Sequence, residues 1–561
     1  MKKKNVASMA MAAMMAAGAL PMNAWAAPEV NHDETLTIEV YDVAANYQGM
    51  QTGWYAKEIK DRFNIELNIV APQVSGDAAS LYQTRCASGD LGDIIILDNA
   101  DMQDCVDVGL IADISEDLPN YENLMKYEEQ ISLFNDAINE VIGKEGVYAI
   151  PAEMNSNGPT EYKEDTVAIM PRLRWDHYVE VGAPEMKNLD DLLDTLKKIQ
   201  DAYPTNEAGD KTYALSLWPD WDNTSIENVN QLTKWYGQEV NGSILLGTDN
   251  SITPLTDKDG AYYKMLKFLY KANQMGLVDP DSATQDWNAA CDKMRQGRVH
   301  LFWYNWQYGF WNSPDKGEAR QNYRGIPLED LNIYQASDTY YGDGRAWAVG
   351  SNVRILEFMD WLCSPEGLTM QHIGQEGFIY TVNDDGTYTL TDAGMTRFAD
   401  DPQVPEELGG GSWTDGNNQV NQWLVASIEM NPETGETFGS DYWASFLEKN
   451  NTATNKEWSE KFGSETEVSY LEENGMLNPV PSVNLVLPID TTDIALIRSQ
   501  CGDQVKATSW QAIFASDDAE FDQMWDEMCV TLEGLGWDQL VEFDTDKYQA
   551  VVDAREAAVA E

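Results

Sequence analysis

The run Ile94-Ile95-Ile96-Leu97 constrains the fold of this chain most, because consecutive apolar residues of this kind suit a strand that is buried on both faces. The stretches before it alternate between strand and helix patterns: 35–40 and 65–70 predict strands, and 53–63 predicts a helix. A further helix is expected at 78–88. This order predicts a parallel, wound α/β sheet.

A second α/β unit follows the stretch 146–151, a short strand that ends in a proline. Further strand patterns occur at 166–173, 213–217 and 299–303, and the C-terminal third is mostly helical in pattern. A chain of 561 residues is long enough for two large lobes of this kind. Helices of the second unit are expected at 189–203, 260–275 and 287–296.

The charge of the chain excludes whole classes of function. It has 37 Lys and Arg against 94 Asp and Glu, so its formal charge is 37 − 94 = −57. A surface this acidic repels phosphate backbones and anionic lipid headgroups, and the longest basic run is Lys2-Lys3-Lys4. Nucleic acids and anionic membranes are therefore not expected as partners.

Residues 1–26 have the pattern of a secretory signal peptide. Three lysines are followed by an apolar stretch rich in Met and Ala, by Pro21 and by Ala24-Trp25-Ala26. No later stretch approaches about 18 consecutive apolar residues, and no cysteine stands near the expected cleavage site to carry a lipid. We therefore expect an extracytoplasmic protein that is secreted, periplasmic or at the cell surface.

The cysteines are spaced too widely for a zinc ribbon or a thioredoxin-type dithiol. In an oxidising compartment, Cys86 with Cys105, or Cys501 with Cys529, can close a local disulfide, and buried free thiols are the alternative. The sequence leaves these alternatives open. The six cysteines are Cys86, Cys105, Cys291, Cys363, Cys501 and Cys529.

Five phrases in a characteristic order span most of the chain after residue 26. They are the strand and helix of 35–63, Ala87-Ser88-Gly89-Asp90-Leu91-Gly92-Asp93-Ile94-Ile95, Gly146-Val147-Tyr148-Ala149-Ile150-Pro151, Met275-Gly276-Leu277-Val278-Asp279-Pro280, and 358–377 with Ser364-Pro365-Glu366-Gly367 and Gly374-Gln375-Glu376-Gly377. In this order they resemble the extracellular solute-binding proteins of family 1, the carbohydrate-binding subunits of ABC importers. Two departures are Gly92 in place of the usual Pro and the missing lipid-anchor Cys.

The resemblance implies an α/β, periplasmic-binding-protein-like fold, in which two discontinuous lobes surround a ligand cleft. Lobe 1 is expected to comprise 27–150 and 298–340, and lobe 2 to comprise 151–297 and 341–561. The resemblance also implies that a monomer captures an oligosaccharide by hinge closure and delivers it to the permease subunits of an ABC transporter. It implies no cofactor.

A site for an uncharged sugar needs flat aromatic side chains against the ring faces and planar polar side chains for the hydroxyls. The chain has 19 Trp, and the family topology implies that several stand at strand ends facing the cleft. Trp303 and Trp306 are expected to form a stacking floor on lobe 1, with packing in a core as an equal alternative. Packing is the favoured alternative for three further candidates, Trp218, Trp221 and Trp413.

Polar candidates follow the ends of strands. Asp98 and Asn99 come directly after the central apolar run, and ligands of wound sheets lie outside the carboxyl ends of strands. The alternative for this pair is a turn or helix N-cap. Tyr47 and Gln48 stand in the same way after the first strand. Arg345 is a candidate for hydrogen bonding to the sugar, with pairing to a carboxylate as the favoured alternative.

Common enzyme motifs are not found in the sequence. Its four histidines do not have H-E-x-x-H spacing, and neither a G-x-S-x-G elbow nor a phosphate-binding loop is present. The stretches 257–260 and 383–386 resemble fragments of calcium loops but lack the distal Glu, so turns are expected there. We therefore predict a binding protein with no catalytic or metal site. A secreted glycan-active hydrolase with a carboxylate pair is the alternative, and a surface adhesin is a third interpretation.

Overall fold

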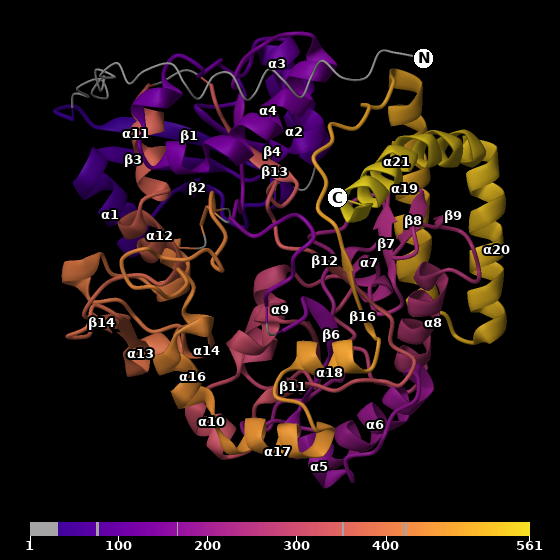
Figure 1. Cartoon of the computed structure of the whole chain (residues 1–561). Helices are drawn as coiled ribbons and strands as arrows, with labels where there is room; N and C mark the ends of the chain where they lie inside the picture. Colours follow the sequence, from indigo (N-terminus) through magenta and orange to yellow (C-terminus); the bar gives the residue numbers. More distant parts are fainter. Residues whose placement is uncertain are drawn as a thin grey trace.

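The computed structural model of the protein describes residues 32–74, 78–164, 166–350, 353–417, 419–420 and 423–560 (Figure 1). The signal peptide expected at 1–26 lies outside these ranges. Buried apolar side chains form separate cores in two lobes. Lobe 1 holds the core residues within 38–154 and 346–443, and lobe 2 holds those within 167–333 and 458–540. No helix of the described residues is both long and apolar enough to span a membrane.

Lobe 1 is built on one large sheet. In order across the sheet its strands are β2 (Gly49–Met50), β3 (Ile65–Val70), β1 (Leu36–Asp42), β4 (Ile94–Asp98), β13 (Arg345–Val349) and β5 (Ala149–Pro151). β1 is parallel to β3 and β4, whereas β13 is antiparallel to β4. Ile94 and Ile96 face one core and Ile95 and Leu97 face the other. The apolar run is therefore a central strand covered on both faces, which confirms the predicted wound sheet.

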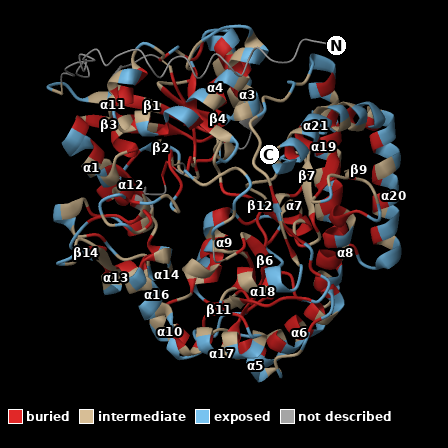
Figure 2. Ribbon diagram, viewed as in Figure 1, coloured by how far each residue is buried: buried red, intermediate tan, exposed pale blue. Residues whose placement is uncertain are grey.

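Helices cover both faces of this sheet. α1 (Gly53–Phe63) and α11 (Val353–Leu362) pack on one face, and α3 (Asn99–Asp107) packs on the other through Met102 and Cys105. Figure 2 shows the buried residues gathered in the sheet beneath these helices. The other helices and strands up to residue 450 that accompany lobe 1 are α2 (Ala78–Ser88), α4 (Glu128–Ile142), α12 (Pro365–His372), β14 (Tyr380–Val382), β15 (Tyr388–Leu390), α13 (Asp392–Met395), α14 (Arg397–Asp400), α15 (Trp413–Asn417) and α16 (Ala444–Asn450).

Lobe 2 has smaller sheets and more helices. Its central sheet has the order β10 (Leu301–Tyr304), β6 (Ile169–Arg174), β11 (Tyr323–Gly325), and both neighbours are antiparallel to β6. The other strands are β7 (Gln238–Asn241), β8 (Ile244–Gly247), β9 (Ile252–Pro254), β12 (Ile333–Ala336) and β16 (Leu477–Val480). The helices are α5 (Trp175–Glu180), α6 (Leu189–Ala202), α7 (Glu227–Thr233), α8 (Ala261–Gln274), α9 (Trp287–Arg295), α10 (Pro314–Glu318), α17 (Ala453–Phe462), α18 (Glu467–Glu473), α19 (Thr492–Ile513), α20 (Asp518–Leu535) and α21 (Trp537–Ala560).

The strand pairing divides the chain differently from the boundaries expected from sequence. The segment 298–340 does not join 27–150, because β10 and β11 pair with β6 and β12 pairs with β16. The next segment does not join lobe 2 directly, because β13 pairs with β4 and β5. The chain therefore enters lobe 2 after β5, returns to lobe 1 before β13, and enters lobe 2 again after α16. Sequence patterns identify strands, but they do not reveal which distant strand is the partner.

The C-terminal part of lobe 2 is fixed to its centre by a buried ion pair. Arg172 of β6 and Glu467 of α18 are both buried, and their side chains are 2.9 Å apart. Glu467 also accepts a hydrogen bond from the backbone of Gly325 in β11 at 2.9 Å. Since an uncompensated buried charge is strongly unfavourable, this pair holds α18 against the central sheet.

The segments that cross between the lobes are hydrogen-bonded to each other. Asn155, after β5, donates to the Thr339 hydroxyl at 3.1 Å, and Asn157 donates to Asp338 at 2.8 Å. Thr339 also donates to the Glu153 carbonyl. Glu153 has a φ of 59°, which a non-glycine residue rarely adopts, so the backbone turns sharply at this crossing.

Candidate functional site

One edge of the lobe 1 sheet collects the loops that follow β1, β3 and β4 and the loop that precedes β13. Asp98, at the end of β4, pairs in register with Arg345, at the start of β13. In wound sheets, ligands lie outside this carboxyl edge. The edge therefore carries several of the polar residues that the sequence singled out.

Short polar contacts hold the loop after β1 in place. Gln48 accepts a hydrogen bond from the backbone of Ala71 at 2.8 Å, and the Tyr47 hydroxyl donates to the Met50 carbonyl at 2.6 Å. Gln73 donates to Asn46 Oδ1 at 2.6 Å, so the loops after β1 and β3 are joined. The side chains of Tyr47 and Gln48 thus bind backbone groups of their own and the neighbouring loop, and that of Asn46 binds Gln73.

Asp98 and Arg345 form a loose pair with Asp343 at the same edge. Arg345 Nε lies 3.6 Å from Asp98 Oδ1, and its Nη1 lies 3.2 Å from Asp343 Oδ2. Asp98 holds the N-cap position of α3 but makes no side-chain capping hydrogen bond there. Asn99 has a buried Oδ1 without a hydrogen-bond partner. The predicted residues Asp98, Asn99 and Arg345 are therefore brought together.

Lobe 2 presents a group of rings that we call the aromatic cluster: Trp218, Trp221, Trp287, Trp303, Tyr304 and Trp306. Trp218 and Trp303 are stacked with their planes 7° apart and centroids 5.5 Å apart. Trp306 stacks on Tyr304 at 4.6 Å. Trp287, the first residue of α9, lies 4.7 Å from Trp218 and 5.4 Å from Trp306. The cluster thus runs from the core of lobe 2 to its surface.

Exposure differs sharply across the aromatic cluster. Trp303 is 1% exposed and Trp306 is 41% exposed. The turn after β10 causes this difference: Gln307 accepts hydrogen bonds from the backbone of Trp303 at 2.8 Å and of Tyr304 at 3.0 Å. The chain is therefore folded back within a few residues, so Trp303 points into the core and Trp306 does not. Trp218, also 1% exposed, lies beneath the cluster with Trp303.

Contacts between the lobes place the aromatic cluster opposite the lobe 1 edge. Trp221 Nε1 donates to Asn46 Oδ1 across the lobes at 3.4 Å. Nearby, Arg295 of α9 donates to the carbonyl of Phe398 in α14 at 3.4 Å. Figure 1 shows α9 on the side of lobe 2 that faces lobe 1. Asn46, Trp221 and Trp306 therefore belong to the boundary between the lobes.

Trp413 lies in lobe 1 and is not part of the aromatic cluster. It is 1% exposed in the core of lobe 1, where its carbonyl accepts a hydrogen bond from Trp54 at 2.9 Å and its ring meets Phe398 edge to face. The sequence interpretation set Trp413 across the cleft from lobe 1 and set Trp303 and Trp306 on lobe 1. In the structure these lobe assignments are exchanged, because β10 pairs with β6 and α15 packs on α1.

Carboxylates dominate the charge around this boundary. Burial raises the pKa of Asp222, next to Trp221, to about 7. On lobe 1, burial, with Asp98 and Asp104 nearby, raises the pKa of Asp101 to about 6. Burial also raises the pKa of Asp343, against the opposing effect of Arg345. The site therefore resists further negative charge.

Sequence reasoning missed Trp287 and Gln73. Trp287 has a local signal, because Asp286 before it is an N-cap whose side chain accepts from the backbone of Ala289 at 2.8 Å. Nothing in the sequence indicates that α9 carries this ring to Trp218. The expected turn at 383–386 is present: Asp385 accepts from the backbone of Thr387 at 3.1 Å. Among the residues that the structure describes, no group of three or more His, Cys, Asp or Glu is arranged to hold a metal ion.

Comparison of the sequence with protein families matches residues 49–368 to the bacterial extracellular solute-binding proteins. A search of curated protein sequences gave no match.

Solved structures with similar folds cover nearly the whole chain. An alginate-binding protein, AlgQ2, has a TM-score of 0.59 at 15% identity, over 92% of this chain and 98% of that one. FusA of S. pneumoniae, an ABC-transporter substrate-binding protein bound to fructo-nystose, has a TM-score of 0.57 at 16% identity, over 92% of this chain and 99% of that one. A human-milk-oligosaccharide-binding solute-binding protein of Bifidobacterium longum infantis has a TM-score of 0.54 at 16% identity, over 93% and 99%. At these identities the likeness establishes the fold.

Proposed function

This chain belongs to the bacterial extracellular solute-binding proteins, and we propose that it captures an uncharged oligosaccharide between its lobes and delivers it to the permease of an ABC transporter. The protein acts outside the cytoplasm, after removal of the segment 1–26, and as a monomer. It binds its ligand and does not change it.

The arrangement of Trp221 and Trp306 opposite Asn46 is the observation that carries this proposal. Trp306 is 41% exposed although it is flanked by other rings, so a flat hydrophobic face is available at the boundary between the lobes. Apolar faces of sugar rings stack on such surfaces, and amide side chains such as Asn46 bind hydroxyl groups. A glycan held by both sides stabilises the closed arrangement of the lobes.

The charge of the site supports an uncharged ligand. Asp98, Asp343 and Asp222 lie near the boundary, and Arg345 already pairs with Asp98 and Asp343. A uronate would add negative charge where burial already disfavours it. The similar AlgQ2 is named as an alginate-binding protein, and alginate is a polyuronate, so we expect the two proteins to differ in the charge of their ligands.

A thermal-shift screen with a panel of glycans tests the proposal. The panel contains neutral fructo-, gluco- and manno-oligosaccharides, milk oligosaccharides and short uronate oligomers. A ligand present at about 100 times its Kd should raise the free energy of unfolding by about 2.7 kcal/mol. Neutral members should raise the melting temperature, and uronates should not.

Recovery of the ligand separates binding from hydrolysis, and the comparisons give no support to a hydrolase. A stabilising glycan incubated with the protein should be recovered by chromatography at its original length. Shortened products from pure protein would show that the protein is a hydrolase and not a binding protein. Stabilisation by uronates alone would overturn the assignment of an uncharged ligand.

A further inference from the structure

Two thiols meet between α2 and α3 on one face of the lobe 1 sheet. The Tyr82 hydroxyl lies 3.3 Å from Cys105 Sγ, and Cys86 is within hydrogen-bonding reach of both Tyr82 and Cys105. Cys86 and Cys105 belong to the same group of packed side chains as Ile95 and Leu97 of β4. The side chains of Cys86 and Cys105 therefore lie close together between α2 and α3.

The two thiols differ in their access to solvent. Cys105 is 1% exposed, whereas Cys86 is partly exposed on α2. Burial raises the pKa of both thiols, and that of Cys105 to about 12. Since the thiolate is the nucleophile, a reagent in solution reacts first with Cys86.

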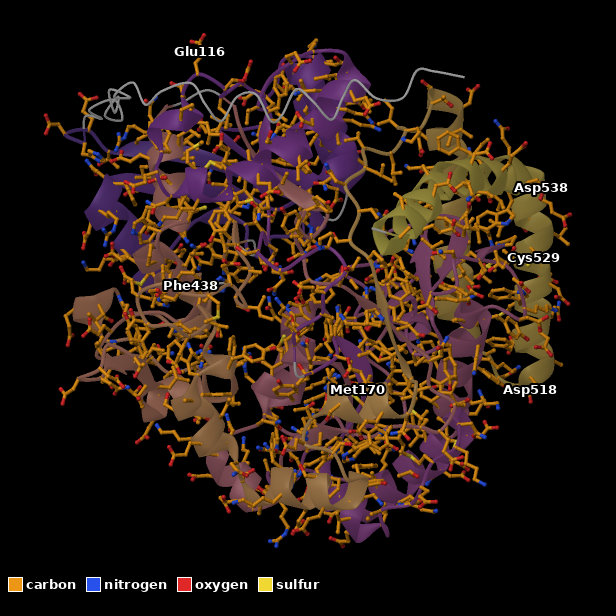
Figure 3. All side chains as sticks on the ribbon, in the orientation of Figure 1. Glu116, Met170, Phe438, Asp518, Cys529 and Asp538 are labelled. Atoms are coloured by element: carbon orange, nitrogen blue, oxygen red, sulfur yellow. The ribbon has the colours of Figure 1, made fainter. Side chains whose placement is uncertain are left out.

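The other cysteines offer a contrast. Cys291, Cys363 and Cys501 are buried, and Cys529 is partly exposed on α20. Figure 3 shows Cys529 on the outer side of lobe 2. The charged groups that act on Cys529 are Asp526, Lys258 and Glu533. Cys529 is therefore a matched control for an accessible thiol in a different setting.

We propose that Cys86 and Cys105 form a disulfide that links α2 to α3 when the protein meets a disulfide oxidant outside the cytoplasm. That the protein meets this oxidant outside the cytoplasm rests on the proposed function, whereas the contact between the two thiols does not. The oxidant is a small or protein disulfide. The Cys86 thiolate attacks one of its sulfur atoms, which gives a mixed disulfide and releases one thiol. The Cys105 thiolate then attacks Cys86 Sγ, which forms the intramolecular bond and releases the second thiol. The two protein thiols lose two protons and two electrons, and the oxidant is reduced to two thiols.

The proposed bond would act on the candidate site through β4. Cys86 precedes β4 and Cys105 follows it, so the closed loop contains Asp98 and Asn99 at the lobe 1 edge. A link between α2 and α3 would restrict this loop in the unfolded chain and fix the C-terminal half of α3 against α2 in the folded one. Residues 86 and 105 thereby form a modification site that supports one wall of the cleft.

The test uses the folded mature chain, reduced first and then treated with glutathione disulfide at pH 8. Thiols are counted after denaturation, and peptides are mapped without reduction. We expect the count to fall from six to four, with Cys86 and Cys105 in one linked peptide. Cys105→Ser should stop the reaction at a glutathione adduct on Cys86, and Cys86→Ser should leave Cys105 unreacted. Cys529→Ser should not prevent the link.

A stable glutathione adduct on Cys86 in the parent protein, six free thiols, or a link between a different pair would each overturn the proposal. Cys86→Ser keeps the test interpretable, because its side chain is partly exposed and the fold does not depend on a buried sulfur there. The thiol count requires no glycan, so failure of this proposal and failure of the proposed function are observed separately.

Discussion

Trp306 and Trp303 stand three residues apart and should respond to substitution in opposite ways. Trp306 is 41% exposed, so Trp306→Ala removes a binding surface and leaves the core intact. Loss of an aromatic contact of this kind typically costs about 2 kcal/mol of binding free energy, or roughly thirtyfold in Kd. Trp303 is 1% exposed, so Trp303→Ala should lower the free energy of unfolding by about 3–5 kcal/mol. Calorimetric titration measures the change in Kd, and unfolding without ligand measures the change in the free energy of unfolding.

Equal losses of stability in the two variants, or unchanged affinity in Trp306→Ala, would contradict this assignment. The sequence predicted that Trp303 and Trp306 belong to one site, but it could not separate their roles. The separation depends on Gln307, which folds the chain back onto Trp303 and Tyr304. The spacing of Gln307, four residues after Trp303, does not by itself predict that the chain folds back there. The prediction of polar residues at strand ends was more informative, because Asp98, Asn99 and Arg345 do meet at one edge.

At the scale of elements, the turn between α2 and β4 requires glycine at position 92. Gly92 has a φ of 133°, and a Cβ there would lie 3.1 Å from the Glu39 carbonyl oxygen. Proline fixes φ near about −65°, so the Pro usual in this phrase cannot occupy this turn. Gly92→Ala should lower the free energy of unfolding by about 1–3 kcal/mol, as measured in urea. Gly89→Ala is the control, because Gly89 also has a positive φ, of 75°, but a Cβ there meets nothing within 4 Å, so this variant should lose less stability. A smaller loss in Gly92→Ala than in Gly89→Ala would refute the argument.

The loop after Trp221 should make the stability of lobe 2 depend on pH. Asp222 accepts hydrogen bonds from Trp510 of α19 at 2.6 Å and from the backbone of Glu227 at 2.9 Å. Burial nevertheless raises its pKa from 3.8 to about 7. Between these values the folded chain retains a proton that the unfolded chain has lost, so this residue makes the free energy of unfolding fall as the pH rises. Below the lower value, both states are protonated.

Asp222→Asn removes this titration, so its free energy of unfolding should fall less than that of the parent between about pH 5 and pH 7. Unfolding in urea at several pH values gives the free energy of unfolding of both proteins. The contributions of other carboxylates cancel when the two values are subtracted at each pH. Parallel curves for the two proteins would show that Asp222 titrates normally. Neither the shift nor its cause was predictable from sequence, because Trp510 reaches Asp222 from a helix almost 300 residues away.

For the whole molecule, the sequence predicted two lobes but divided the chain between them differently. Its local patterns identified β1, β3, β4 and α9 closely. It placed 298–340 in lobe 1, whereas the antiparallel pairing of β10 with β6 places this segment in lobe 2. Pairing is decided by side-chain packing across a sheet, which a pattern along one strand does not contain. The chain therefore crosses between the lobes after β5, before β13 and after α16.

Closure about these crossings should make the protein more compact when it binds a glycan. Each lobe has its own packed core, so the lobes should move as units while the crossings near Asn155 and Thr339 change conformation. Small-angle scattering should give a smaller radius of gyration at saturating ligand than without ligand. At a ligand concentration only a few times the Kd of the parent, a much smaller fraction of Trp306→Ala should be compact, because its Kd is expected to be roughly thirtyfold higher. It should become compact at a correspondingly higher concentration. A radius that does not change in the parent, although calorimetry shows binding, would mean that the ligand enters an already closed cleft and that the hinge does not drive capture.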